Sequence, residues 1–232
     1  MCSSDLNVAI FGDSILRGVI IDEENGKYKF SDHIDWEFVE DKLNIKIDNN
    51  AKMGAVIGYG KKKLEKYLDT HDDMFAVLIE FGGNDCDFNW QEVANNPQYN
   101  HQPKTPLNEF KNTLIEMIDI LQQKNIKPIL MNLPPIHSKL YYDWIKKDLD
   151  NGDNILEFLG DIEQITRHQS RYSNVIAEVA NLKKVELVDV RSAFLSTRSY
   201  LTYMCKDGIH PNQKGGQLVL DVFLEYYKAG IN

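Results

Sequence analysis

The feature that most constrains the fold is an alternation of short apolar runs with longer stretches of helical periodicity. Five short runs indicate buried strands, at residues 7–11, 45–48, 75–81, 127–132 and 185–190. Stretches with helical spacing stand between and after them, at residues 36–43, 57–68, 107–121, 154–181 and a last helix capped by Asn212. This order predicts an α/β fold with a mainly parallel five-stranded sheet and helices on both of its faces.

Length and charge limit the remaining possibilities. A chain of 232 residues allows one large domain or two small ones. No composition break, internal repeat or low-complexity linker divides it, so we expect residues 1–232 to form a single domain. The net charge of -9 disfavours a protein that grips nucleic acid or an anionic membrane, because both partners require basic patches. We therefore expect no nucleic-acid partner and no integral membrane association.

The cysteines and the N-terminus bear on the compartment. Cys2, Cys86 and Cys205 form no Cys-x-x-Cys pair, which argues against a disulfide framework and a zinc site. Residues 1–5 lack the basic region and the long apolar region of a signal peptide, and no apolar run approaches the ~18 residues of a membrane span. We expect a cytoplasmic protein with reduced thiols, and the alternative is a secreted protein whose signal has been removed.

Residues suited to catalysis follow the predicted strands. In open α/β sheets, ligands bind outside the carboxyl ends of the strands. Four segments follow predicted strands and should open onto that edge, at residues 12–14, 49–54, 82–85 and 207–211. Together they supply a serine, small or amide-bearing residues, and an Asp/His pair, which is the set of groups that nucleophilic acyl transfer requires.

Each of these groups has a predicted role. Ser14 would be the nucleophile, and His210 the base that takes its proton, since an ordinary imidazole is largely neutral at pH 7. Asp207, three residues earlier, can orient the imidazole through one ring nitrogen. The oxyanion of the tetrahedral intermediate needs hydrogen-bond donors, which the backbone N–H groups of Ser14 and Gly54 and the side-chain amide of Asn84 could provide.

The four segments resemble the four sequence blocks of the GDSL, or SGNH, hydrolase family. The matching residues, in chain order, are Gly12-Asp13-Ser14-Ile15 with Gly18, then Gly54, then Gly82-x-Asn84-Asp85, and finally Asp207-x-x-His210-Pro211. The resemblance extends from residue 7 to about residue 220. Ile15 replaces the leucine of the family name, and the glycine block departs most, because Lys52 and Met53 stand where the family has small residues.

The resemblance implies a three-layer α/β/α sandwich of flavodoxin-like type and a serine esterase, lipase or acylhydrolase activity without cofactor or metal. It carries over Ser14 as nucleophile, His210 as base and Asp207 as the acid that orients it. Gly54 and Asn84 are carried over as oxyanion donors beside the N–H of Ser14. The Gly-x-Ser-x-Gly elbow of the other α/β-hydrolases is not present around Ser14.

Substrate recognition is less constrained by the sequence. Residues 86–104 and 134–144 are expected to be long polar loops, and Trp90, His137 and Trp144 on them are candidate substrate contacts. Packing of the two tryptophans against the body is the competing interpretation. We expect short-acyl esters, such as acetyl esters of carbohydrates or of neutral small molecules. The alternatives are a lysophospholipase or thioesterase and, in a different class, a non-catalytic flavodoxin-like module that binds a small ligand. The sequence does not indicate an oligomeric state.

Overall fold

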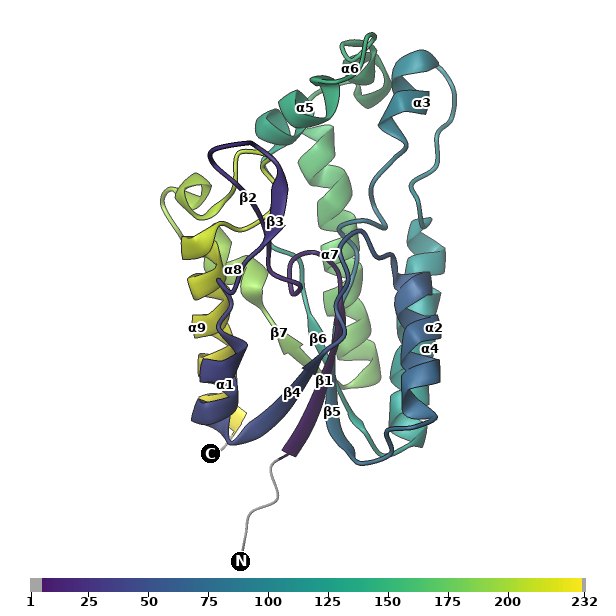
Figure 1. Ribbon diagram of the computed structural model, residues 1–232. Coiled ribbons are helices and arrows are strands. Elements are labelled where there is room, and N and C mark those ends of the chain that lie inside the picture. Colours follow the sequence, from purple (N-terminus) through teal and green to yellow (C-terminus); the bar gives the residue numbers. More distant parts are fainter. Residues whose placement is uncertain (1–5, 231–232) are drawn as a thin grey trace, which may run out of the picture.

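A parallel five-stranded sheet forms the centre of the computed structural model, which describes residues 6–230 (Figure 1). Its strands, in spatial order, are β4 (Ile45–Asn49), β1 (Leu6–Gly12), β5 (Met74–Glu80), β6 (Lys127–Met131) and β7 (Glu186–Val188). Every neighbouring pair in this sheet is parallel, so the predicted fold class is confirmed. The predictions made from residues 1–5 and from Cys2 concern a segment outside the described residues.

Helices cover both faces of the sheet and make three layers. One face carries α2 (Ile57–Leu68), α4 (Leu107–Gln123) and α7 (Gln164–Lys183). The other carries α1 (Trp36–Leu43), α8 (Val190–Leu195) and α9 (Gln213–Gly230). Along β1, Ala9 and Phe11 pack into the first layer while Ile10 packs into the second, as the two-residue period of a strand requires. Both faces of this strand are therefore core.

Some predicted boundaries are wrong, each for a local reason. The helix expected over residues 154–181 is two helices, α6 (Asn154–Leu159) and α7, because Gly160 adopts a positive φ of 77° and ends the first one. The last strand stops at Val188, since the Asp189 side chain accepts the N–H of Ser192 and starts α8. Asn212 accepts the N–H groups of Lys214 and Gly215 at the start of α9, as predicted.

A layer of short elements lies over the carboxyl ends of the strands. The two segments expected to be loops contain helices, α3 (Trp90–Asn95) and α5 (Ser138–Lys146), and these gather with α6 at one end of the molecule (Figure 1). Their apolar side chains form a separate cluster that includes Phe88, Tyr142 and Ile155. A two-stranded hairpin of β2 (Val19–Ile21) and β3 (Tyr28–Phe30) and a short 3-10 helix, η1 (Tyr200–Tyr203), complete the described elements.

None of the helices within residues 6–230 combines the length and apolar character needed to cross a bilayer. The compartment expected from the sequence stays a prediction.

Candidate active site

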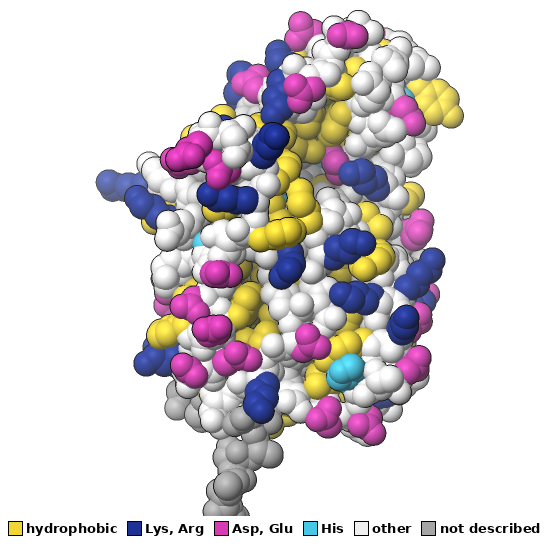
Figure 2. Space-filling view, viewed as in Figure 1, with side chains coloured by type: hydrophobic (Ala, Val, Ile, Leu, Met, Phe, Trp, Pro, Cys, Tyr) yellow, Lys and Arg dark blue, Asp and Glu magenta, His cyan; other side chains and the backbone are white. Residues whose placement is uncertain are grey.

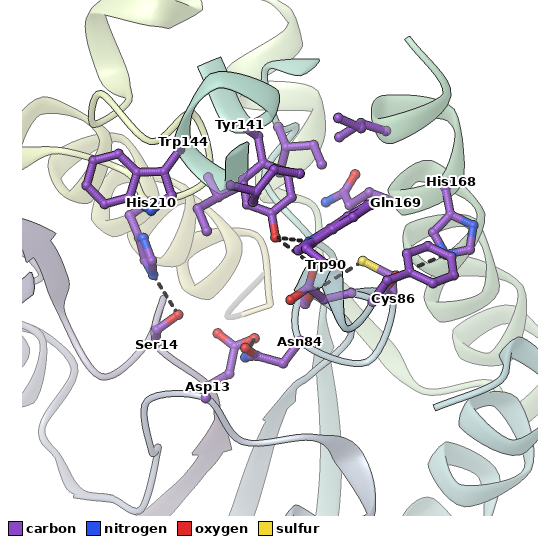
Figure 3. Close-up of a pocket in the computed structure, with 18 of the residues that line it drawn as sticks. Asp13, Ser14, Asn84, Cys86, Trp90, Tyr141, Trp144, His168, Gln169 and His210 are labelled. Carbon is purple, nitrogen blue, oxygen red and sulfur yellow. Dashed lines mark hydrogen bonds between the residues drawn. The ribbon is translucent and has the colours of Figure 1, made fainter. Parts of the chain in front are cut away.

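Ser14, His210 and Asp207 form one hydrogen-bonded row at the carboxyl end of the sheet. Ser14 Oγ lies 2.9 Å from His210 Nε2, and His210 Nδ1 lies 2.6 Å from Asp207 Oδ2. With Nδ1–H donating to the Asp207 carboxylate, Nε2 is the acceptor of the Ser14 hydroxyl proton. Ser14 is 8% exposed, His210 4% and Asp207 0%, so the row is shielded from water except at the serine end. Figure 3 shows the Ser14–His210 contact.

The segment that carries Asp207 and His210 is held by its own backbone. Asp207 Oδ1 accepts the N–H groups of Ile209 (3.1 Å) and His210 (3.2 Å), which leaves Oδ2 free to face the imidazole. Gly208 has a φ of +74°, and a Cβ there would lie 2.7 Å from the Cβ of Leu140. Glycine is therefore required for this turn to approach α5.

Hydrogen bonding decides the charge of the acid in this row. Burial by itself would raise the pKa of Asp207, but the hydrogen bond and charge of His210 and the two backbone N–H donors lower it below its ordinary value. Asp207 is thus a carboxylate at neutral pH, as a group that stabilises an imidazolium must be.

Tyr28 covers the outer side of this row. Its ring meets the His210 imidazole edge-on, with 5.1 Å between centroids, and lies 5.7 Å from the Trp144 ring. Burial, followed by the negative charge of Asp207, raises the pKa of the Tyr28 hydroxyl, which keeps this group neutral. The sequence interpretation missed Tyr28. The Asn25-Gly26 pair in the connection between β2 and β3 is a hairpin signal that could have indicated the element.

The three predicted oxyanion donors line one cavity with the serine. Ser14 follows β1, and Asp13 shapes the turn by accepting the N–H of Ile15 at 3.0 Å. Gly54 has a φ of +77° with open space where a Cβ would lie, so the backbone conformation rather than crowding favours glycine. Asn84 Nδ2 donates to Asp13 Oδ2 at 3.1 Å, which leaves the second N–H of the amide available. Figure 3 shows Asn84 and Asp13 side by side near Ser14.

The cavity at this site has a volume of about 660 Å³ and extends well beyond the serine. Ser14 and His210 line one part of it, and apolar side chains of the covering helices line another. These apolar residues include Trp144, Ile145, Leu149, Phe158, Leu159 and Ile165. In the space-filling view, hydrophobic side chains (yellow) line the hollow below α5 and α6 (Figure 2). The cavity is thus a mainly apolar pocket with the polar row at one side.

The structure places two of the three candidate substrate contacts at the cavity. Trp90 and Trp144 both line the cavity. His137 does not: its Nδ1 accepts the N–H of Leu140 and its own N–H donates to the Gly208 carbonyl, so it caps the start of α5. The cap holds the His137 ring at the start of α5 through Nδ1, and a substrate contact for His137 stays a prediction.

A half-buried polar cluster anchors Trp90 and was not predicted. Trp90 Nε1 and the Tyr141 hydroxyl both donate to Asp87 Oδ1 at 2.7 Å, and Lys104 pairs with Asp87 Oδ2 at 2.9 Å. Burial, and then the charge of Asp87, raise the pKa of the Tyr141 hydroxyl. These contacts join α3 to α5, and Figure 3 shows Trp90 and Tyr141 between Ser14 and Trp144 on one side and Cys86 and His168 on the other. Trp90 therefore has both of the roles weighed from the sequence, packing and lining.

The described cysteines are buried and uncharged. Cys86 donates to the Gly83 carbonyl, and burial raises the pKa of its thiol well above the ordinary value. Burial likewise raises the pKa of Cys205 to about 11. A thiol that stays protonated is a weak nucleophile. Within residues 6–230, no three His, Cys, Asp or Glu side chains gather as they would around a metal ion.

Comparison with known proteins places this geometry in a family. Residues 10–218 match the GDSL-like Lipase/Acylhydrolase family. A search of curated proteins finds no significant match.

Solved structures share the fold at low sequence identity. A lipase/acylhydrolase from Enterococcus faecalis is 19% identical, with 97% of this chain and 96% of that one covered and a TM-score of 0.69. A catalytic mutant of Axe2, an acetylxylan esterase from Geobacillus stearothermophilus, is 17% identical, with 97% and 94% covered and a TM-score of 0.65. The psychrotrophic esterase EstA from Pseudoalteromonas sp. is 17% identical, with 98% and 100% covered and a TM-score of 0.62. At these identities the likeness concerns the fold.

Proposed function

Because this chain belongs to the GDSL-like lipase/acylhydrolase family and is a carboxylic ester hydrolase, we propose that it cleaves esters through Ser14 by way of an acyl-enzyme. The observation that carries the proposal is the continuous row from Ser14 Oγ through His210 to Asp207, with separations of 2.9 Å and 2.6 Å. Each group in this row is already oriented for the proton transfer that makes a serine nucleophilic.

The reaction has two halves. His210 Nε2 takes the proton of Ser14 as Oγ attacks the ester carbonyl, and the resulting imidazolium then protonates the departing alcohol. The C–O bond of the ester breaks and an acyl-Ser14 ester remains. In the second half, His210 takes a proton from water, the hydroxide attacks the acyl carbonyl, and Ser14 leaves with the proton. Asp207 stays a carboxylate throughout and stabilises the imidazolium.

We assign the oxyanion to the N–H groups of Ser14 and Gly54 and to the free N–H of the Asn84 amide. All three residues line the cavity beside Ser14 Oγ. The Asp13 carboxylate supports the assignment for Asn84, because only an amide nitrogen can donate to it. The Asn84 donor is thus held in advance of the reaction, which is the condition under which such a donor is most effective.

For the acyl group we favour a medium-length chain over acetate. The expectation of a short acyl group was based on the polar composition of the segments between the motifs. In the structure, parts of these segments fold into helices whose apolar side chains line the cavity. A volume of about 660 Å³ lies within the roughly 300–1,000 Å³ of ordinary small-ligand sites and far exceeds what an acetyl group fills. Acetyl esters of carbohydrates remain the competing substrate class, with Trp144 as the stacking residue.

Removal of the Ser14 hydroxyl tests the reaction. We expect Ser14→Ala to abolish turnover of p-nitrophenyl esters and labelling by a fluorophosphonate probe. Ser196→Ala, which removes an exposed hydroxyl from the end of α8, should change neither. Full activity of Ser14→Ala, or no turnover of any ester by the unaltered protein, would reject the proposal and favour a non-catalytic ligand-binding module.

A chain-length series tests the acyl preference. Burial of one methylene contributes about 0.8 kcal/mol, or roughly a fourfold gain in kcat/KM per methylene while the chain stays inside the cavity. We expect kcat/KM on p-nitrophenyl esters to rise from acetate and to peak near octanoate. A peak at acetate, together with release of acetate from acetylated xylo-oligosaccharides, would instead support the carbohydrate esterase. Esters of glycerophosphocholine and thioesters, tested at the preferred chain length, separate the remaining alternatives.

A further inference from the structure

Glu80 is a buried carboxyl that the reaction described above does not use. It ends β5, is 0% exposed, and pairs in register with Gly12 of β1, the residue before Asp13. A Cβ at position 12 would lie 2.9 Å from Glu80 Oε2 and 3.0 Å from the Glu80 carbonyl oxygen. Gly12 therefore leaves the space that the Glu80 carboxyl occupies.

Glu80 touches Asp13, and Asp13 touches Asn84. The Asp13 N–H donates to Glu80 Oε2 at 3.2 Å, so the Glu80 carboxyl lies directly against Asp13. Asp13 is itself 1% exposed, and both of its oxygens already have donors: Oδ1 accepts the N–H of Ile15 and Oδ2 accepts Nδ2 of Asn84. Asp13 thus acts as an acceptor at both oxygens, which is the behaviour of an ionised carboxylate.

The proton of the pair therefore belongs on Glu80. Glu80 Oε1 is buried without a hydrogen-bond partner, whereas Oε2 lies against Asp13, so a proton on Oε2 is the one that can be donated to the Asp13 carboxylate. No ion pair among the described residues involves either carboxyl. Two adjacent buried charges without a cation are too costly to coexist. The titratable groups that face the pair are Asp85, which acts on both carboxyls, and His210 and Cys86, which act on Asp13. Burial raises the pKa of both carboxyls, and the pKa of Glu80 is raised well above its ordinary value because the charge of Asp13 adds to its burial.

We propose that Glu80 is a positioning residue whose carboxylic acid donates a hydrogen bond to the Asp13 carboxylate and so fixes the Asn84 amide toward the oxyanion. The inference rests on the proposed function, because it acts through the Asn84 donor. No proton leaves Glu80 during the reaction. Held on one side by Glu80, Asp13 keeps Oδ2 directed at Asn84 Nδ2, and the second N–H of that amide stays available for the substrate oxygen.

Two substitutions at position 80 separate hydrogen bonding from packing. Glu80→Gln keeps the shape, donates an N–H to Asp13 and accepts the Asp13 N–H, so we expect kcat within about threefold of the unaltered enzyme. Glu80→Met fills similar space and cannot donate. Since misplacing a reacting group by about 1 Å can cost 10²-fold, we expect kcat to fall roughly 10- to 100-fold with little change in KM. Circular dichroism and thermal melts establish that both variants are folded.

A double-mutant cycle tests the route through Asn84. In an Asn84→Ala background the donor is already absent, so Glu80→Met should lower kcat by less than about threefold, although it lowers kcat 10- to 100-fold alone. An infrared difference spectrum at pH 7 between the unaltered protein and Glu80→Gln should contain the carbonyl stretch of a protonated carboxylic acid. A purely structural role for Glu80 would not give this non-additivity, and an ionised Glu80 would not give this band.

Three results would overturn the inference. They are unchanged kcat in a folded Glu80→Met, equal losses from Glu80→Gln and Glu80→Met, and a loss in the Asn84→Ala background as large as in the unaltered one. The proposed function fails by a separate result, which is activity in Ser14→Ala. An inactive Ser14→Ala combined with a fully active Glu80→Met rejects only the role of Glu80.

Discussion

Asp207→Asn is the substitution for which the structure dictates the outcome most fully. Asp207 Oδ1 is held by the N–H groups of Ile209 and His210, so the one oxygen of an asparagine must face these two donors. The amide nitrogen of the substituted side chain would then face His210 Nδ1. That arrangement forces Nδ1 to accept and moves the ring proton to Nε2, which points at Ser14. The imidazole can no longer take the serine proton.

The magnitude follows from the same contacts. At the observed 2.6 Å, a carboxylate and an imidazolium attract by about 6 kcal/mol at an effective dielectric constant of 20. The equivalent substitution in serine proteases lowers kcat about 10⁴-fold, or roughly 5.4 kcal/mol. The two figures agree, so we expect kcat of Asp207→Asn to fall by about four orders of magnitude.

The assay is kcat on a p-nitrophenyl ester at pH 7, with a thermal melt to establish folding. Asp221→Asn, an exposed change of the same chemistry on α9, serves as the control and should leave kcat unaltered. Retention of more than about 1% of kcat by a folded Asp207→Asn would refute the tautomer argument, because the wrong ring nitrogen would then be no obstacle.

Three further predictions concern the oxyanion, the pH dependence of stability and the cavity. Asn84→Ala should lower kcat by 10²–10³ with KM little changed, measured by steady-state kinetics; a loss under tenfold would remove Asn84 from the oxyanion site. Burial raises the pKa of Asp85 to about 6, so the folded state keeps a proton that the unfolded state has lost between pH ~4 and ~6. The free energy of unfolding should therefore fall by up to about 3 kcal/mol as the pH rises through this window, and Asp85→Asn should flatten that part of a urea-unfolding series; an unchanged slope would contradict it. Leu149 is half-buried and lines the cavity, so Leu149→Trp should fill part of the space for the acyl chain. The chain-length optimum should move to shorter esters, while kcat/KM on the acetate ester stays within about twofold. An unmoved optimum would show that acyl chains do not reach this part of the cavity.

Local patterns predicted the sheet and the residues that follow its strands. Apolar runs stopped by glycine at Gly12 and Gly82 mark strand ends, and these ends carry Ser14 and Asn84. Because parallel strands bring their carboxyl ends to one edge, Ser14 and His210 could be expected to meet although 196 positions separate them. Local spacing also indicated the Asp207–His210 pair, since the two lie on one turn.

The surroundings of the site depended on contacts between distant segments. His137 was expected to line the pocket, but in the structure its ring nitrogen caps the start of α5. The polar segments around Trp90 and Trp144 fold into short helices whose apolar sides have no long periodic run to reveal them, and only their packing makes the apolar cavity. The acyl preference proposed above therefore rests on tertiary packing and not on a local sequence pattern.

Glu80 is the clearest case of a residue whose role depends on contacts between distant segments. In the sequence it is one polar residue at the end of an apolar strand, with nothing to indicate a partner. Pairing of β1 with β5 sets it opposite Gly12 and against Asp13, 67 positions away, and there it is buried without a cation. Strand and helix periodicity depends on neighbouring residues, so the sequence by itself determined the fold class and indicated the groups that we propose to react. The ionisation of buried groups and the shape of the cavity depend on which segments pack together, and only the tertiary structure decided them.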